Sequence, residues 1–533
     1  MPAGIELARH ACLPCRRSKR RCDRKLPSCD LCIKKDTDCN YPGARTSERD
    51  SRTVYSQTPD SQSSPETVRS CNTEASAVYF LAPHLFRQAQ LELPRSDFPI
   101  PAEVSSLIGD ASSIREIAKT FFSTIHLWLP IIFKKGFFVS MLNPWTQRQT
   151  ELSLLALCMK LCNTAPSEDD GSNNFLYRTA KRFHHEVVTA GVLSTHVLQA
   201  GLLIALYEMG HAMYPAAYLT VGACSRYGLA LGIQQNCYPT SAADDGLEMR
   251  GQRSWNEVEE NRRVWWAVLT FDRFLNLNNP ARPLSTEDPT FDTYLPVDDT
   301  SWNDCTAKAS DSVKISTGFS LKLGGFARLA QATYLLSQAF HSVAPSAVIE
   351  DGIKDLDQTA QLRRTLLALV HAADSEATHR RLDFCASSEL SFSAILLLQQ
   401  HHFQHIAIFN MPDVLPGVSF DHLWSESFEA VNRLIKAAAS YINLTTAEPS
   451  KADCIPIFFT HVLYQVGCIL LMFTRGALLD GKIGEKLGVV KSLLLRVNAR
   501  WRVAGIYADV LQAQEIELAS ETHNTTRPFV CLT

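Results

Sequence analysis

Residues 11–42 read ACLPCRRSKRRCDRKLPSCDLCIKKDTDCNYP, and this stretch decides how the N-terminal part of the chain folds. It contains two C-x2-C pairs, and after six further residues each pair is followed by a third cysteine. C-x2-C pairs this close together are typical of a zinc site. The six cysteines are Cys12, Cys15, Cys22, Cys29, Cys32 and Cys39. We therefore predict a small domain that folds around metal.

The number of thiols predicts the number of metal ions. Two separate tetrahedral zinc sites need eight ligands, so six thiolates complete two sites only if two of them are shared. The spacing has two halves that begin at Cys12 and Cys29, and we expect these two residues to bridge both Zn2+ ions. A single zinc ion with two spare thiols is the alternative, but it leaves the repeated spacing unexplained. A disulfide framework fits less well, because residues 1–11 lack the apolar stretch of a signal peptide.

Cations surround the cysteines. Residues 1–45 contain 11 Arg and Lys against 5 Asp and Glu, so this segment carries a charge of +6 in a chain of −3. Such a concentration of cations on a small module neutralises phosphates and indicates DNA binding. We predict a short helix over residues 16–21 that is held at both ends by zinc-bound cysteines and enters a major groove. The predicted DNA-contacting residues are Arg16, Arg17, Lys19, Arg20 and Arg21.

This segment resembles the fungal zinc binuclear cluster (Zn2Cys6) DNA-binding domain. The features that carry the resemblance, beyond the cysteine spacing, are the basic run 16–21, Pro27 and Tyr41-Pro42. The resemblance implies that Cys12 and Cys29 bridge two zinc ions and that Lys19 contacts bases. It also implies double-stranded DNA with CGG-like triplets as the target. A nuclear-import role for the same basic run is compatible with DNA contact.

The rest of the chain has the composition of a large helical body. Residues 43–111 are predicted to be a mostly disordered linker, because 43–75 are rich in Ser, Thr and charged residues. From residue 112 onward apolar residues recur at helical spacing, and no alternating strand pattern is evident. One predicted helix, over 195–210, carries Leu198, Leu202, Leu206 and Met209 on one face. The predicted fold is a small Zn2Cys6 binuclear cluster domain plus a large all-α regulatory domain, joined by the linker.

Three stretches resemble the fungal-specific transcription factor domain, also called the middle homology region. They are residues 121–133, 198–233 and 261–296, and the last is the most specific, with Trp265-Trp266 and Asp272-Arg273. The resemblance implies a helical regulatory domain whose ligands and partners differ between members. The predicted domains are the cluster at 1–42, the linker at 43–111, the fungal-specific domain at 112–300 and a helical continuation at 301–533.

Other features were interpreted conservatively. Residues 455–473 are almost long enough to cross a membrane, but Pro456 and several polar residues interrupt them, so we predict a buried core helix and no membrane partner. The charged pairs Arg262-Arg263 and Asp272-Arg273, on an otherwise apolar helix, predict internal ion pairs. A ligand pocket at this place is the alternative. Residues 508–526 mix acids with hydrophobes, which fits an activation segment or an amphipathic final helix equally well.

These observations together predict a nuclear, zinc-dependent, sequence-specific RNA polymerase II transcription factor that recruits the transcription machinery. Resemblance to fungal regulators implies control of one pathway, including secondary-metabolite gene clusters. No three-heptad run lies within 43–101, so we expect any homodimer to form through the helical body. A small-molecule effector stays open as a further partner. No catalytic motif occurs, so we predict no enzyme; the alternative is a ligand-sensing or enzyme-like body that the cluster targets to DNA.

Overall fold

The computed structural model describes residues 8, 10–18, 20–35, 39, 75–89, 91, 98–143, 149–166, 174–238, 254–319, 323–344, 352–380, 385–409, 435, 448–475 and 481–525. The chain forms two compact units, Met1–Thr67 and Val68–Thr533. Within the described ranges both units are helical, and an isolated bridge pairs Tyr294 with Lys314. The predicted fold class, a small cluster domain and an all-α body, is confirmed. Most of the predicted linker, residues 43–74, lies outside the described residues.

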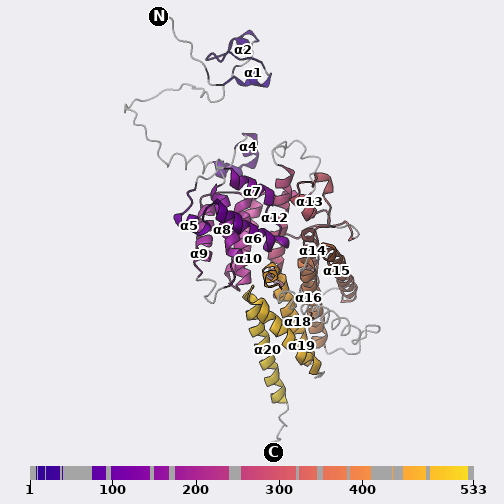
Figure 1. The fold of residues 1–533 in the computed structure, drawn as a ribbon. Coiled ribbons are helices and arrows are strands. Elements are labelled where there is room, and N and C mark those ends of the chain that lie inside the picture. Colours follow the sequence, from indigo (N-terminus) through magenta and orange to yellow (C-terminus); the bar gives the residue numbers. More distant parts are fainter. Residues whose placement is uncertain are drawn as a thin grey trace, which may run out of the picture. The chain divides into compact units, whose positions relative to one another are not determined.

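The helices carry the labels of Figure 1. The first unit contains α1 (Leu13–Arg17) and α2 (Asp30–Lys34). The second unit, called the helical body below, contains α4 (Pro83–Gln88), α5 (Ala102–Ile108), α6 (Ala111–Ser123), η1 (Ile125–Leu127), α7 (Lys134–Leu142), α8 (Gln149–Asn163), α9 (Phe175–Thr189), α10 (Thr195–Gly210), α11 (Ala216–Leu231), η3 (Ile233–Cys237), α12 (Trp255–Phe274), α13 (Asp299–Asn303), η6 (Ala309–Asp311), α14 (Gly325–Val343), α15 (Gly352–Arg380), α16 (Ala386–Phe409), η8 (Pro449–Cys454), α18 (Phe458–Arg475), α19 (Gly481–Val497) and α20 (Val503–Thr525).

Local sequence explains where several of these helices begin and end. Asp110 caps α6 by accepting a hydrogen bond from the Ser113 amide, and Ser254 and Glu257 form a reciprocal capping box at α12. α11 ends at Gly232, which adopts the left-handed conformation (φ 68°) that glycine reaches at little cost. The predicted helix over 195–210 is confirmed.

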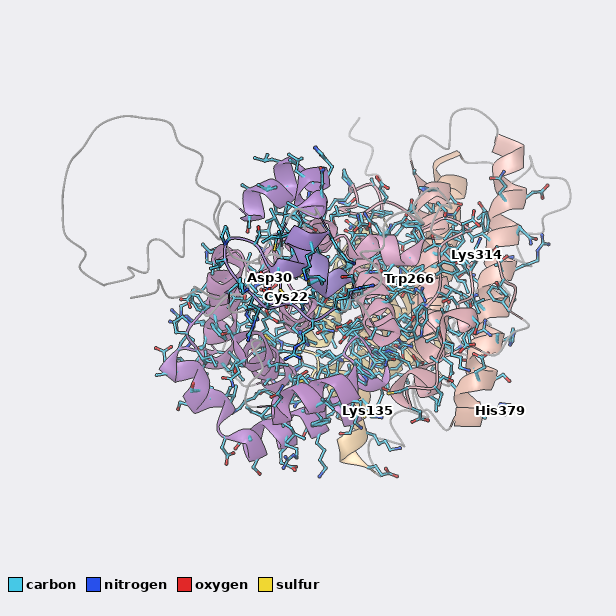
Figure 2. All side chains as sticks on the ribbon, turned by 90° about the horizontal axis from the view of Figure 1, so that it is seen from above. Cys22, Asp30, Lys135, Trp266, Lys314 and His379 are labelled. Carbon is cyan, nitrogen blue, oxygen red and sulfur yellow. The ribbon has the colours of Figure 1, made fainter. Side chains whose placement is uncertain are left out.

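The centre of the body is α10. Every residue of α10 from Val197 to Gly210 is buried, and the helix packs against α8, α9, α11 and α12. α14, α15 and α16 form a second group, and α18, α19 and α20 lie together at one end of the body (yellow in Figure 1). Figure 2 shows side chains filling the space between these helices, with Trp266 in the interior and His379 at the periphery.

α12 is also buried, although it is rich in charged residues. The Arg263 guanidinium donates to Glu259 Oε1 (2.9 Å), Asp299 Oδ1 (2.7 Å) and the Val297 carbonyl (2.7 Å). Arg273 donates to Asp288 Oδ1 (2.8 Å) in the same way. The predicted internal ion pairs are confirmed, and they hold the chain between α12 and α13 against α12.

The helical body begins earlier than residue 112. α5 buries Val104 and Ile108 in the same core as α10, and Lys160 on α8 donates to the Leu107 carbonyl (2.6 Å). Upstream, the Tyr79 hydroxyl donates to the Ala230 carbonyl of α11 (2.9 Å). The predicted linker is therefore too long at its C-terminal end. A seven-residue helix with two buried residues is too short to show a helical period in the sequence.

Two segments near the C-terminus form helices, as their sequences allow. α18 lies in the body core, with Phe458, Val462 and Val466 buried. In the part of the chain that the structure describes, every helix is too short or too polar to cross a membrane. Residues 508–525 belong to α20, whose Leu511 packs against Gly467 of α18, so this segment adopts the helical alternative.

Candidate metal centre and nucleic-acid interface

The two C-x2-C pairs occupy equivalent places on two short helices. Cys12 precedes α1 and Cys29 precedes α2, both with extended backbone, and Cys15 and Cys32 lie one turn into their helices. A residue at the N-cap and the third residue of the helix share one side of the first turn. The repeated spacing therefore brings two thiols together at the start of each helix, and the packing of α1 against α2 brings the two pairs together.

The sulfur atoms of these four cysteines form one buried group. Cys12 Sγ lies 3.6 Å from the Sγ atoms of both Cys29 and Cys32. Cys15 Sγ lies 3.6 Å from Cys29 Sγ and 4.0 Å from Cys32 Sγ. All four side chains are at most 3% exposed. No disulfide joins any cysteine among those that the structure describes.

The remaining two cysteines pack against this group. Cys22 Sγ lies 3.8 Å from Cys12 Sγ. Cys39 Sγ accepts a hydrogen bond from the Cys29 backbone amide (3.2 Å). All six predicted metal ligands therefore lie in one cluster. The third cysteine of each half contacts the first cysteine of the same half.

The spacing of the sulfur atoms fits zinc. Thiolates bind Zn2+ at about 2.3 Å in a tetrahedron, which places neighbouring sulfur atoms about 3.8 Å apart. The separations of 3.6–4.0 Å in the cluster bracket this value and are far longer than a disulfide bond. Soft thiolates are also the donors that favour zinc over Mg2+ or Ca2+. The residues present thus fit tetrahedral zinc.

Protonation of these thiols is strongly affected by burial. Burial raises the pKa of the Cys12 and Cys15 thiols and raises that of Cys32 to about 12. Burial acts in the same direction on Cys29, but hydrogen bonds from the Cys32 amide and from neighbouring thiols outweigh it and lower the pKa of Cys29 to about 6. Because metal binds thiolates, zinc must displace protons from most of these groups.

The predicted recognition helix is wrong in its bounds. α1 spans Leu13–Arg17 instead of 16–21, because Pro14 favours a helix start at this point and the chain turns after Ser18. The Ser18 hydroxyl donates to the Pro14 carbonyl (2.8 Å), and the Arg20 amide donates to the Cys15 carbonyl (3.0 Å). Hydrogen bonds of this kind satisfy the last carbonyls of a helix and stop it.

The cations around the cluster are mostly exposed. Arg16, Arg20 and Arg21 are exposed; Lys19 and the side chain of Arg17 lie outside the described residues. Lys34 and Lys35, which do not belong to the predicted DNA-contacting residues, are also exposed at the end of α2. Aligning the two halves of the cysteine repeat places Lys34 at the position of Arg17, and that symmetry was the signal that could have identified it.

The loop between the two halves is held by its own charges. Lys25 Nζ lies 2.6 Å from Asp30 Oδ2 and 3.8 Å from Asp23 Oδ2, and both Asp23 oxygens accept from the Asp30 amide (3.3 Å). Lys25 is therefore engaged within the domain. Arg16 and Lys34, at the ends of α1 and α2, are exposed.

Comparison with known proteins agrees with this geometry. Residues 10–48 match the fungal Zn(2)-Cys(6) binuclear cluster domain, and residues 118–365 match the fungal specific transcription factor domain. The second match spans α10 and α12, the buried centre of the body.

Individual relatives share parts of the chain. It is 38% identical over 170 residues to "Transcription factor BOA15" of Botryotinia fuckeliana, covering 31% of this chain and 86% of that protein. It is 24% identical over 221 residues to "Transcription factor tazR" of Aspergillus terreus, covering 38% of this chain and 32% of that protein. It is 25% identical over 183 residues to "Pigment biosynthesis transcriptional activator pigB" of Monascus ruber, covering 33% of this chain and 32% of that protein.

These matches and the thiol cluster lead to one conclusion. The matching cluster domain binds two zinc ions, in agreement with the count of six thiolates. The BOA15 relative is matched over most of its length, whereas the chain spans about a third of the other two. The chain belongs to the family of fungal Zn2Cys6 binuclear cluster transcription factors.

Proposed function

We propose that the six cysteines hold the two zinc ions with Cys12 and Cys29 as the shared ligands. The observation that carries this assignment is the position of these two sulfur atoms. Cys12 Sγ lies within 3.8 Å of Cys22 from the first half and of Cys32 from the second half. Cys29 Sγ lies 3.6 Å from Cys15 of the first half and accepts from the Cys32 amide of its own half. A sulfur that lies close to both halves can serve both ions.

Zinc analysis of the purified full-length protein tests this assignment. Two zinc ions per chain are expected, and Cys12→Ala or Cys29→Ala should lose both. Cys15→Ala or Cys39→Ala should weaken one site first. Cys305→Ala in the helical body should keep both ions and serves as the control, because its half-buried thiol lies in the other unit. One zinc per chain in the wild type would refute shared ligands.

The cluster domain then presents its cations to DNA. We assign base contact to Lys19 and phosphate contacts to Arg16, Arg17, Arg20 and Arg21, because the described ones are exposed and lie beside the rigid cluster. Cations on a module that metal holds rigid lose little entropy when they bind phosphate. CGG-like triplets are the proposed target, by resemblance to the family.

The biological role we propose is that of a nuclear, pathway-specific regulator of transcription by RNA polymerase II. The helical body would have no enzymatic activity. A relative named as a pigment biosynthesis activator supports a secondary-metabolite gene cluster as the regulated pathway. Genome-wide DNA occupancy, combined with transcript changes after deletion, tests this role. Occupied promoters should belong to one biosynthetic cluster and should change expression. Occupancy spread over housekeeping genes without such a cluster would refute it.

We also propose that a homodimer forms through the helical body. α5 packs in the core of the body, and the Tyr79 hydroxyl donates to the Ala230 carbonyl of α11, so these segments do not form a separate coiled coil. Sedimentation should show a monomeric fragment 1–67, which is the first compact unit, and an association that requires residues 68–533. A tight dimer of the 1–67 fragment would contradict this arrangement.

A further inference from the structure

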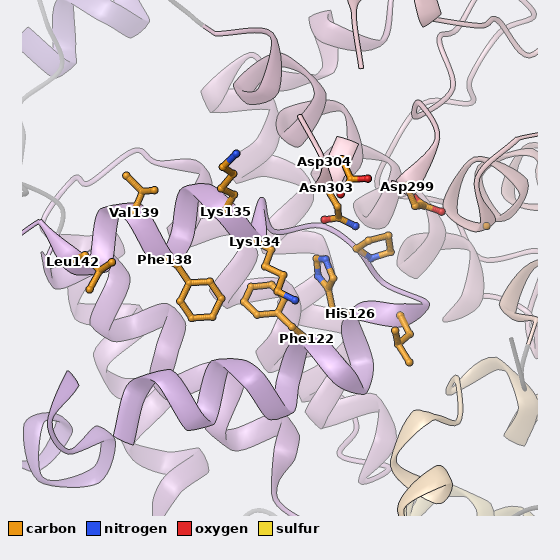
Figure 3. Close-up of a pocket in the computed structure, with 13 residues that line it drawn as sticks. Phe122, His126, Lys134, Lys135, Phe138, Val139, Leu142, Asp299, Asn303 and Asp304 are labelled. Carbon is orange, nitrogen blue, oxygen red and sulfur yellow. The ribbon is translucent and has the colours of Figure 1, made fainter. Parts of the chain in front are cut away.

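The helical body contains a pocket of about 650 Å³ between α7 and the chain around α13. Its residues come from the end of α6, η1, α7, α13 and the first residue of α14. Figure 3 shows Phe138, Val139 and Leu142 along α7 on one side, and Asp299, Asn303 and Asp304 on the other. The volume lies within the range of pockets that bind small molecules.

One wall of this pocket is apolar and open to solvent. Leu127, Val139 and Leu142 are 52%, 62% and 65% exposed, which is high for large hydrophobic residues that share one surface. Phe122 and Phe138 continue the wall inward, with ring centroids 5.7 Å apart. An apolar body placed here would remove these side chains from water and gain the corresponding free energy.

The inner end of the pocket carries hydrogen-bonding groups without partners. His126 is 5% exposed, and among the described residues neither of its ring nitrogens has a hydrogen-bond partner. Asn303 Oδ1 is also buried without a partner. Burial, together with Arg263 and Lys134, lowers the pKa of His126 to about 3, so the ring is neutral and offers one N–H donor. A buried donor without a partner costs free energy that a bound oxygen would recover.

The charges at this end favour an anion. Lys134 Nζ lies 5.6 Å from the centre of the Phe122 ring, beside His126, and Lys135 is exposed on the next position of α7. Of the two carboxylates, Asp299 is already engaged, since Oδ1 accepts from Arg263 and Oδ2 accepts from the Phe326 amide (3.2 Å). Asp304 is exposed at the far side of the opening.

We propose that this pocket binds a small organic acid with a ring-containing apolar body. The rings would lie against Phe122, Phe138 and Leu142, and the acidic oxygen would accept from His126 and pair with Lys134. A hydrogen bond to an ionised oxygen is stronger than one between neutral groups.

The pocket is placed to influence the body beyond its own walls. The carbonyl of Pro130, which lines the pocket, accepts a hydrogen bond from the Arg263 guanidinium (3.3 Å). The backbone amide of Phe133, the residue before α7, donates to Glu260 Oε1 (2.8 Å). Both partners lie on α12, and Arg263 also holds Asp299 at the other wall. A ligand that contacts both walls would therefore bias the position of α7 and α13 against α12. That this bias regulates transcription rests on the proposed function, whereas the binding itself does not.

Fluorescence titration of the full-length zinc-loaded protein tests the proposal with two probes. The first is 8-anilinonaphthalene-1-sulfonate, an aromatic anion, and the second is N-phenyl-1-naphthylamine, which has the same rings without the acid. Lys134→Met should lower the affinity for the anionic probe about tenfold and leave the affinity for the neutral probe unchanged. Leu142→Glu should weaken both. The matched controls are Lys119→Met, on exposed α6 surface, and Leu495→Glu, a similarly exposed leucine of α19.

The outcomes separate the parts of the proposal. Saturable binding of one anionic probe per chain that is lost in the pocket variants and kept in both controls supports it. Loss in Leu142→Glu with an unchanged Lys134→Met would refute an acidic ligand. Absence of saturable binding, or equal loss in the controls, would overturn the site altogether. Zinc content and DNA binding by the cluster domain are measured in parallel, and a failure there would refute the proposed function instead.

Discussion

Arg263 shows how a single residue stabilises the helical body. Its side chain is fully buried and stacks on Trp302, with the guanidinium carbon 4.1 Å from the ring centre. It also pairs with Asp299 and with Glu259, which Arg262 contacts as well. Removing one partner of a buried ion pair leaves the other charge without compensation, and this costs more than the pair itself contributes.

We expect Arg263→Met to lower the free energy of unfolding of the body by about 3–5 kcal/mol. Arg282→Met is the control, because Arg282 is exposed and only lies over Tyr218. Urea unfolding followed by tryptophan fluorescence measures the difference, since all eight tryptophans lie at or beyond residue 128. Equal midpoints for the two variants would show that the Arg263 network does not stabilise the fold.

Lys19 and its neighbours should differ in what they contribute to DNA binding. We expect Lys19→Ala to cost about 1–3 kcal/mol and to relax the base preference, because a cation that reads a base edge discriminates between bases. Arg21→Ala should weaken binding to all DNA sequences alike. It should also reduce the slope of log affinity against log salt concentration by about one. Selection from random DNA and salt titrations measure both effects. An unchanged selected motif in Lys19→Ala would disprove its role in base recognition.

Pairs of packed helices depend on residues that allow close approach. Gly210 ends α10 directly beneath Trp501, and a Cβ atom at this position would lie 2.3 Å from the Trp501 ring. Trp501 cannot easily move, because it is 1% exposed and its Nε1 donates to the Ile455 carbonyl (2.9 Å). We expect Gly210→Ala to destabilise the body by about 1–3 kcal/mol.

Gly222 on α11 provides the matched control for this substitution. A Cβ atom there would meet nothing within 4 Å, so Gly222→Ala should be neutral or stabilise by up to about 1 kcal/mol, as expected in an open helical position. Thermal unfolding of both variants measures the contrast. A destabilised Gly222→Ala with an unchanged Gly210→Ala would contradict the packing of α10 against Trp501.

Zinc removal should affect the two units differently. α1 and α2 have five residues each, which is too short for stable helices in isolation, and their shared core consists of cysteines. Small metal modules of this kind fold together with their ion. We expect a chelator to unfold the cluster domain around α1 and α2, seen as lost amide dispersion in NMR spectra. Tryptophan fluorescence of the body should not change, and a parallel change would mean that the body also depends on zinc.

The molecule as a whole should lose stability in mild acid because of its buried histidines. Burial lowers the pKa of His126 and His461 to about 3 and of His184 and His211 to about 4. In the unfolded chain histidine titrates near 6.5, so below that pH the unfolded state binds protons that the folded state excludes. The stability is complete above pH 6.5 and is lost as the pH falls toward the folded values.

We expect a loss of roughly 1 kcal/mol per buried histidine for each pH unit below 6.5. Urea midpoints of the body at pH 7.5, 6 and 5 measure this slope. His461→Gln should flatten it, whereas His84→Gln, at an exposed position of α4, should leave it unchanged. A midpoint that is constant between pH 7.5 and 5 would show that these histidines are not excluded from protonation.

The amino-acid sequence alone predicted the metal centre, because the cysteine spacing lies within one short segment and the coordination number of zinc fixes how many thiols two ions need. The spacing predicted the six thiols that the structure brings into one cluster, and the sharing of Cys12 and Cys29 stays a prediction. Long helices such as α10 and α11 were also predictable, since their apolar period and the glycine that ends α11 lie within one segment.

Other features were decided only by the tertiary structure. α1 ends at Arg17 because of hydrogen bonds from Ser18 and Arg20, whose geometry the run of cations conceals. α5 belongs to the body because α8 and α9 cover it, although its own sequence is too short to indicate this. The pocket joins His126 to Asn303 across more than 170 residues of chain. Such a site arises from packing between distant segments, and no local pattern encodes it.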